Sequence, residues 1–250
     1  YFLSVVLIGT VYPIFLDVIS SQKISVGPPF YHKLMIPFLI PFLIMMAIGP
    51  KLRWIKSQLE DKIYLISFFI ISILLAFLVL KNFNQNVLIN TILISSALYL
   101  FFITLRDFFV KKYKNISQNI AHFGFSLLIL SILFNNLFAS EIITNLKVGE
   151  TFENSKTKIV FESIDQKKKQ NYDAIIANFK ISNTNGEEDK LSPELRIYNQ
   201  PVIATSEADI KTTLMSDKFI VINLVQNQDF FNVRYQVKPF MLWIWLSVIL

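Results

Sequence analysis

The amino-acid sequence predicts a multi-pass membrane bundle of α-helices with a small extracytoplasmic all-β domain inserted near its C-terminal end. Two observations lead to this fold class. Long apolar runs follow one another through the first part of the chain, and a polar stretch with alternating apolar residues comes after them. The composition agrees, because 53% of the 250 residues are hydrophobic, only 17% are charged, and the mean hydropathy is +0.49. Such values are typical of a membrane protein.

The apolar runs are long enough to span a membrane, which takes about 20 residues of helix. Five runs meet this requirement, at 2–19, 34–50, 63–81, 87–105 and 119–138. Pro37 and Pro41 lie in the second run, where we expect a kink and not a break, because neighbouring helices can satisfy the freed carbonyls. The chain does not begin with Met, and its last apolar run is cut short. We therefore interpret it as an internal piece of a longer polypeptide.

Basic residues in the short loops predict the orientation of these helices. The loops 51–62 and 106–118 are rich in Lys and Arg, whereas the loops 20–33 and 82–86 are poorer. The positive-inside rule therefore places the first two loops in the cytoplasm. Alternating crossings then put residues 139–238 on the outer side. The net charge of +6 is explained by these loops, so we expect no nucleic-acid partner.

The polar stretch carries the signals of β-strands. Apolar and polar residues alternate in "DAIIANFKISN" (173–183) and in "FFNVRYQVK" (230–238), and a period of two indicates half-buried strands. "NTNGEED" (183–189) predicts a turn, and "DQKKKQN" (165–171) predicts a solvated loop. The stretch is long enough for a small independent domain. The predicted organisation is a transmembrane bundle at 1–138, a β domain at 139–238 and the start of a truncated last helix at 239–250.

His122 is the main candidate for chemistry within the apolar runs. It lies in "NIAHFGFSLLIL" (119–130), and an ionisable residue inside a spanning helix is a functional candidate by default. Two interpretations remain equal on the local pattern: a structural histidine that reaches interfacial water or a carbonyl, and a ligand or proton carrier. Ala121 and Gly124 keep the helix surface low, which suits a planar cofactor or close helix packing equally.

His32, in "GPPFYHK" (27–33), is expected at the outer end of the second helix. It would be separated from His122 by something like the roughly 30 Å thickness of the hydrocarbon core, so the two cannot share one metal ion. We interpret His32 as a surface residue and Gly-Pro-Pro as a rigid connector. "KPFMLWIWL" (238–246) marks the return to the membrane lipid, with two Trp residues placed for an aromatic belt.

Catalytic side chains are not identified by any of these patterns. The chain has no cysteine, which excludes disulfides, thiolate metal sites and a C-x-x-C-H haem attachment motif within it. There is also no Ser/His/Asp set and no carboxylate pair in an apolar setting. The sequence alone therefore leaves the catalytic residues unknown.

Several motifs occur together in an order that resembles the C-terminal part of the CcmF family and its NrfE-type relatives. They are "KISVGPPFY" (23–31), "IGPKLRW" (48–54), "AHFG" (121–124), "VGET" (148–151), "PELRIYNQPVIATSEADI" (193–210) and "KPFMLWIWL". The Gly-Pro-Pro segment and the final Trp-containing block are the most specific of them. The resemblance covers essentially the whole chain.

The resemblance implies a multi-pass haem lyase subunit of cytochrome c biogenesis in the bacterial inner membrane, with residues 139–238 in the periplasm. Such a subunit takes its substrate haem from the haem chaperone CcmE and attaches it to the C-x-x-C-H thiols of apocytochrome c. CcmH and CcmI help to present the apocytochrome. Family members also hold a b-type haem as a reductant between two histidines, and His122 falls on one of these positions as an axial ligand of the haem iron. The second ligand and a Trp-rich haem-handling segment would lie outside this fragment.

Two other function classes are compatible with the residues. A non-catalytic membrane scaffold could use the outer domain to dock partner proteins. A transporter usually needs several polar residues or broken helices around a midplane site, and the apolar runs offer His122 and a few Ser, Thr and Asn.

Overall fold

Five long helices form the first part of the protein in a computed structural model, which describes residues 1–20, 23–52, 62–81, 83, 87–110, 116–183, 186–225 and 229–250. They are α1 (Phe2–Ser20), α2 (Pro28–Ile48) with a 3₁₀ turn at Gly49–Lys51, α3 (Lys62–Leu80), α4 (Val87–Val110) and α5 (Ile116–Phe138). All five are long and apolar enough to cross a membrane, which confirms the predicted bundle. The predicted basic loop 51–62 lies mostly outside the described residues. Of the predicted loop 106–118, residues 106–110 belong to α4 and 116–118 to α5, and 111–115 lie outside the described residues.

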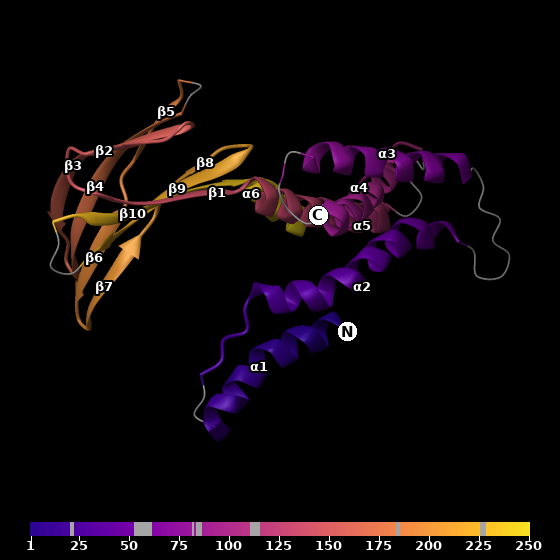
Figure 1. The fold of residues 1–250 in the computed structure, drawn as a ribbon, viewed down its shortest axis with the longest axis horizontal. Coiled ribbons are helices and arrows are strands. Elements are labelled where there is room, and N and C mark those ends of the chain that lie inside the picture. The colour runs from indigo at the N-terminus through magenta and orange to yellow at the C-terminus, as the bar shows by residue number, and fades with distance from the viewer. Residues whose placement is uncertain are drawn as a thin grey trace. The chain divides into compact units, whose positions relative to one another are not determined.

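The chain divides into two compact units, one of Tyr1–Leu130 with Ser247–Leu250 and one of Ser131–Leu246. Figure 1 shows the helices of the first unit in indigo to magenta and the strands of the second in salmon to yellow. The domain boundaries expected from the sequence stay a prediction.

Helix α2 begins earlier than the apolar run predicted. Gly27 is its N-cap, and Pro28 and Pro29 occupy the first helical positions, where a missing N–H and a preset φ are favourable. The Gly-Pro-Pro segment is therefore the start of a helix, and interpreting it as a connector was wrong. Pro37 and Pro41 do not end the helix, as expected for a spanning segment.

Helix α4 continues past the predicted end of its run, through Arg106 and Asp107 to Val110. Both charged side chains have partners. Asp107 accepts two hydrogen bonds from Lys51, and the guanidinium of Arg106 lies 3.6 Å from the ring centroid of Tyr64. Because these charges are paired, they do not force the helix to end.

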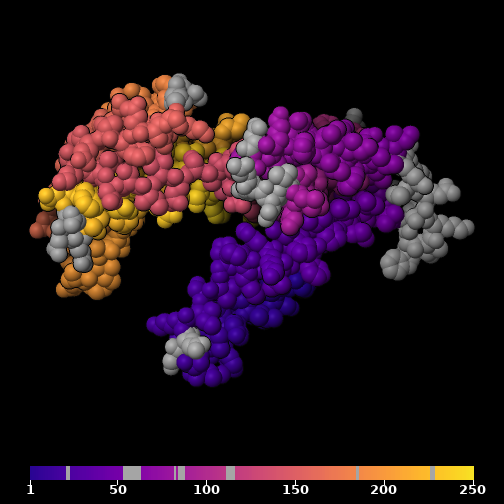
Figure 2. Space-filling view, in the orientation of Figure 1, coloured from indigo at the N-terminus to yellow at the C-terminus, as the bar shows by residue number. Residues whose placement is uncertain are grey.

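The second unit contains two antiparallel sheets. One sheet has the order β1 (Ser140–Leu146), β10 (Phe231–Pro239), β9 (Ser216–Leu224) and β8 (Asp209–Thr212). The other has the order β2 (Thr151–Glu153), β3 (Thr157–Lys168), β4 (Tyr172–Asn183), β6 (Glu194–Asn199) and β7 (Val202–Glu207), and β5 (Glu188–Leu191) also pairs with β4. In Figure 2 the salmon residues around β2 and β3 form much of the visible face of this unit. A last apolar helix, α6 (Met241–Ile249), follows β10.

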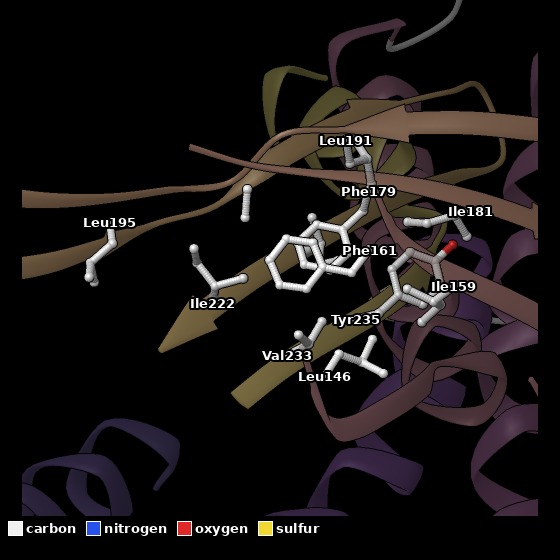
Figure 3. Close-up of a cluster of buried hydrophobic side chains, with 12 residues drawn as sticks. Leu146, Ile159, Phe161, Phe179, Ile181, Leu191, Leu195, Ile222, Val233 and Tyr235 are labelled. Atoms are coloured by element: carbon white, nitrogen blue, oxygen red, sulfur yellow. The ribbon is translucent and has the colours of Figure 1, made fainter. Parts of the chain in front are cut away.

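The core of this unit consists of side chains from both sheets (Figure 3). Phe161 on β3 and Phe179 on β4 stack with their ring centroids 4.4 Å apart, and Val233 and Tyr235 on β10 are also buried. Phe179, Val233 and Tyr235 lie on the apolar faces that the alternating pattern predicted. The strands predicted at 173–183 and 230–238 are thereby confirmed.

Two predicted connections had different outcomes. The turn predicted after β4 is confirmed at its described residues, where Gly186 has a φ of +78° and donates its N–H to the carbonyl of Asn183. The solvated loop predicted at 165–171 was wrong for most of its length, because β3 continues to Lys168 and pairs with β4. Its charged side chains are exposed, so no apolar alternation was present to indicate a strand.

Candidate functional site

The imidazole of His122 lies on the second turn of α5 and is half-buried. Among the described residues it has no hydrogen-bond or ion-pair partner. An unpaired histidine in an apolar helix is costly unless something else binds it. A neutral imidazole offers one ring nitrogen as an acceptor or metal ligand and one as a donor, so this side chain can take an axial position on a metal.

The structure shows why one of the two small residues near His122, Gly124, is a glycine. A Cβ on Gly124 would lie 2.9 Å from Cβ of Leu250 and 3.0 Å from the carbonyl oxygen of Ser247. This glycine is therefore needed for close packing of α5 against the end of α6. Residues two apart on an α-helix point about 200° away from one another, so His122 lies on the opposite side of α5 from this contact.

Aromatic side chains hold the start of α5 in place. The ring of Phe123 contacts Phe101 and Phe108 of α4, at centroid distances of 5.5 and 5.4 Å. Phe125 contacts Phe42 of α2 edge-on at 6.0 Å. These contacts hold the backbone of α5 in place directly after His122.

A buried ion pair lies at the same end of the bundle. The ammonium of Lys51 is 2.7 Å from Oδ2 of Asp107, and the two side chains are only 6% and 10% exposed. Phe108, the neighbour of Asp107, contacts Phe123, which places the pair near the level of His122. The sequence analysis treated Lys51 only as one of the basic residues of a loop, so it missed this ion pair. The signal that could have revealed the pair is Asp107, an acidic residue close to the end of an apolar run.

His32 lies at the other end of α2. It is exposed and stands near the start of this helix, whereas Lys51 is at its end. The 19 residues between them correspond to about 28 Å along a straight helix at 1.5 Å per residue. His32 therefore lies near one end of α2, and His122 lies near the level of the other end; the predicted separation across the membrane stays a prediction. Within the described ranges, no group of three or more His, Cys, Asp or Glu could hold a metal ion. The described residues could thus supply one axial ligand to a haem iron, His122, and a second ligand would have to come from elsewhere.

The β unit has a polar cluster of a different kind. Asp189 on β5 accepts a hydrogen bond of 2.7 Å from Lys218 on β9 and another from Lys211 on β8. Burial opposes the charged form of Asp189, but the two ammonium groups outweigh it and hold the pKa of this carboxyl below its usual value. The cluster joins strands of the two sheets, and its arrangement is that of a structural ion network.

Comparison with known proteins finds similarity to cytochrome c biogenesis proteins. Residues 137–239 match a family model described as the CcmF C-terminal β-sandwich. The cytochrome c-type biogenesis protein CcmF of Pseudomonas fluorescens is 26% identical over 99% of this chain and 40% of its own length. CcmF of Escherichia coli strain K12 is 23% identical over 96% of this chain and 39% of its own length. A probable NrfE of the same organism is 22% identical over 97% of this chain and 34% of its own length.

A solved structure has the same fold. The protein described as cytochrome c heme lyase CcmF superposes with a TM-score of 0.72 and 19% identity, over 99% of this chain and 41% of its own. The chain thus spans about 40% of the length of the relatives it matches.

Proposed function

Because this chain belongs to the CcmF/NrfE family of cytochrome c biogenesis proteins, we propose that it is the C-terminal part of a haem lyase subunit. In this role the whole protein receives haem from the chaperone CcmE and joins the haem vinyl groups to the two C-x-x-C-H thiols of apocytochrome c. CcmH and CcmI present the reduced apocytochrome. The similarity over 99% of the chain to a biogenesis protein supports this proposal.

His122 is proposed as one axial ligand of a b-type haem in the membrane. The observation that carries this role is a half-buried imidazole without a partner among the described residues. One ring nitrogen would bind the iron, and the other would donate to an acceptor that fixes the ring orientation. The bound haem would supply one-electron chemistry for reducing the substrate haem iron. Phe101, Phe108 and Phe42 keep α5 positioned for this ligation.

The location of the β unit suits this function. We propose that the protein lies in the bacterial inner membrane with residues 139–238 in the periplasm, where apocytochrome thiols are joined to haem. The unit stands between α5 and α6 along the chain, so it can meet periplasmic partners while both of its ends return to the membrane.

The experiment that tests the ligand is the absorption spectrum of the full-length protein purified in detergent. His122→Ala is expected to remove most of the b-type Soret band without loss of membrane insertion, and added imidazole is expected to restore part of it. His32→Ala is the matched control, because it removes the other histidine of this chain and should leave the band unchanged. An unaltered spectrum in His122→Ala would refute the assignment. A non-catalytic scaffold would bind no chromophore even in the wild-type protein.

A further inference from the structure

The turn between β8 and β9 lies directly against the start of α6. The indole N–H of Trp243 donates to the carbonyl of Leu214 over 2.9 Å, and the N–H of Phe240 donates to the carbonyl of Met215 over 2.8 Å. The turn is closed by Thr213, whose hydroxyl and N–H both donate to the carbonyl of Ser216. Its position relative to α6 is thus fixed by hydrogen bonds at both of its central residues.

The side chains at the tip of this turn are apolar and point into open space. Leu214 is 67% exposed and Met215 is 66% exposed. Single exposed apolar residues are common on protein surfaces and need no explanation. Two adjacent ones held beside the entry of an apolar helix are different, because the same lipid that surrounds the helix can cover them.

The turn lies beside the ends of two apolar helices. The end of α5 and the start of α6 meet here, since the amide of Asn135 donates to the carbonyl of Pro239 and the rings of Phe134 and Phe240 lie 5.7 Å apart. From this point α5 and α6 are apolar helices. Pro239 also pairs with Ser216 at the end of the turn. The turn therefore lies where the chain passes from α5 into the strands and from the strands into α6.

We propose that Leu214 and Met215 insert into the head-group region of the outer leaflet and seat the β unit on the lipid surface. Trp243 lies beside them, and Trp residues are enriched at this depth because their rings are amphipathic. Lys238 is close in sequence and can extend its ammonium to lipid phosphates. The contact would restrict the orientation of the β unit relative to the membrane, whatever reaction the protein serves.

Site-directed fluorescence tests this contact in the full-length protein. The present chain has no cysteine, so after replacement of any cysteine elsewhere a single Leu214→Cys can be labelled with bimane. The probe is a vesicle of phosphatidylcholine and phosphatidylglycerol in which part of the phosphatidylcholine is brominated near the head-group end of its chains. We expect brominated lipid to quench the label at position 214 several-fold more than aqueous iodide does. A label on Met215→Cys is expected to behave in the same way, and this variant replaces Leu214→Cys in the experiment if Leu214→Cys does not fold.

Leu224 provides the matched control. It is also an exposed leucine and ends the same strand β9, about 26 Å from Ser216 at roughly 3.3 Å per residue. A label on Leu224→Cys should be quenched by iodide and barely by brominated lipid. Equal iodide quenching at positions 214 and 224 would overturn the proposal. Protection of position 214 from both quenchers would also overturn it, because protein and not lipid would then cover the turn.

Discussion

At the scale of single residues, the pair of Lys51 and Asp107 carries a large share of local stability. Removing one partner of a buried ion pair leaves an uncompensated charge and costs about 3–5 kcal/mol. We expect Asp107→Asn to lower the free energy of unfolding of the full-length protein by about 3 kcal/mol, because Lys51 is only 6% exposed. Titration with SDS in detergent micelles measures this change.

The control for this prediction removes both charges together. The double variant Lys51→Met with Asp107→Leu leaves neither charge of the buried pair behind, and replacing such a pair with apolar residues is often neutral. Arg106, which lies 3.9 Å from Asp107, is 23% exposed and keeps its contact with the ring of Tyr64. It should recover most of the stability that Asp107→Asn loses. If the single variant were as stable as the wild type, the pair would be solvated in the membrane and not buried as its side-chain exposure indicates.

Single residues differ in how much of their role the sequence alone could predict. His122 could be found because an ionisable side chain in an apolar run is rare. The role of Gly124 could not be decided, since a small residue serves a cofactor and a helix contact equally until its neighbours Ser247 and Leu250 are placed. Asp107 was assigned to a loop, because no local pattern reveals that its partner lies on another helix.

At the scale of elements, the ion network at Asp189 connects the two sheets. The native pKa of Asp189 is lowered, so its contribution to stability is complete above the ordinary carboxyl pKa of about 4 and is lost as the pH falls through the lower native value. Asp189→Asn removes this contribution and leaves the buried Lys218 with only the exposed Glu187, 3.3 Å away, as an acidic partner. The change is expected to cost about 3 kcal/mol near neutral pH. Acid titration of the β-sheet circular dichroism signal of the full-length protein should show an unfolding step at higher pH in the variant.

Glu188→Gln is the neighbouring control on β5. Glu188 is 58% exposed and pairs with Lys180 on the surface, and exposed pairs contribute little because water screens them. The acid titration of this variant should follow that of the wild type. Identical titrations of Asp189→Asn and the wild type would show that the network does not stabilise the sandwich.

The strands and helix ends were predictable to different degrees. β4 and β10 were indicated by alternation because each has one face in the core. The C-terminal end of β3 was missed because its residues 165–168 are exposed, so they show no apolar alternation although they pair with β4. The start of α2 was placed too late because its first residues are prolines, which hydropathy does not separate from a connector.

At the scale of the whole molecule, the membrane class was predictable because 53% hydrophobic residues cannot all be buried in small bundles of helices. Large apolar side chains such as Leu3, Ile63 and Leu88 remain exposed in the structure, as lipid-facing residues do. The positive-inside rule predicts the orientation, but Lys51 contributes less to this prediction than a free loop charge because Asp107 neutralises it. The predicted orientation therefore depends mainly on the other basic residues of the segments 51–62 and 106–118.

Cysteine accessibility tests this orientation directly. Ser155 is exposed in the β unit, and Leu52 is 44% exposed just after the end of α2. If residues 139–238 are periplasmic, a membrane-impermeant maleimide should label Ser155→Cys in intact cells. Leu52→Cys should be labelled only after the inner membrane is permeabilised. The opposite pattern would mean that the loop charges do not set the topology, and it would place the β unit on the wrong side for joining haem to periplasmic thiols.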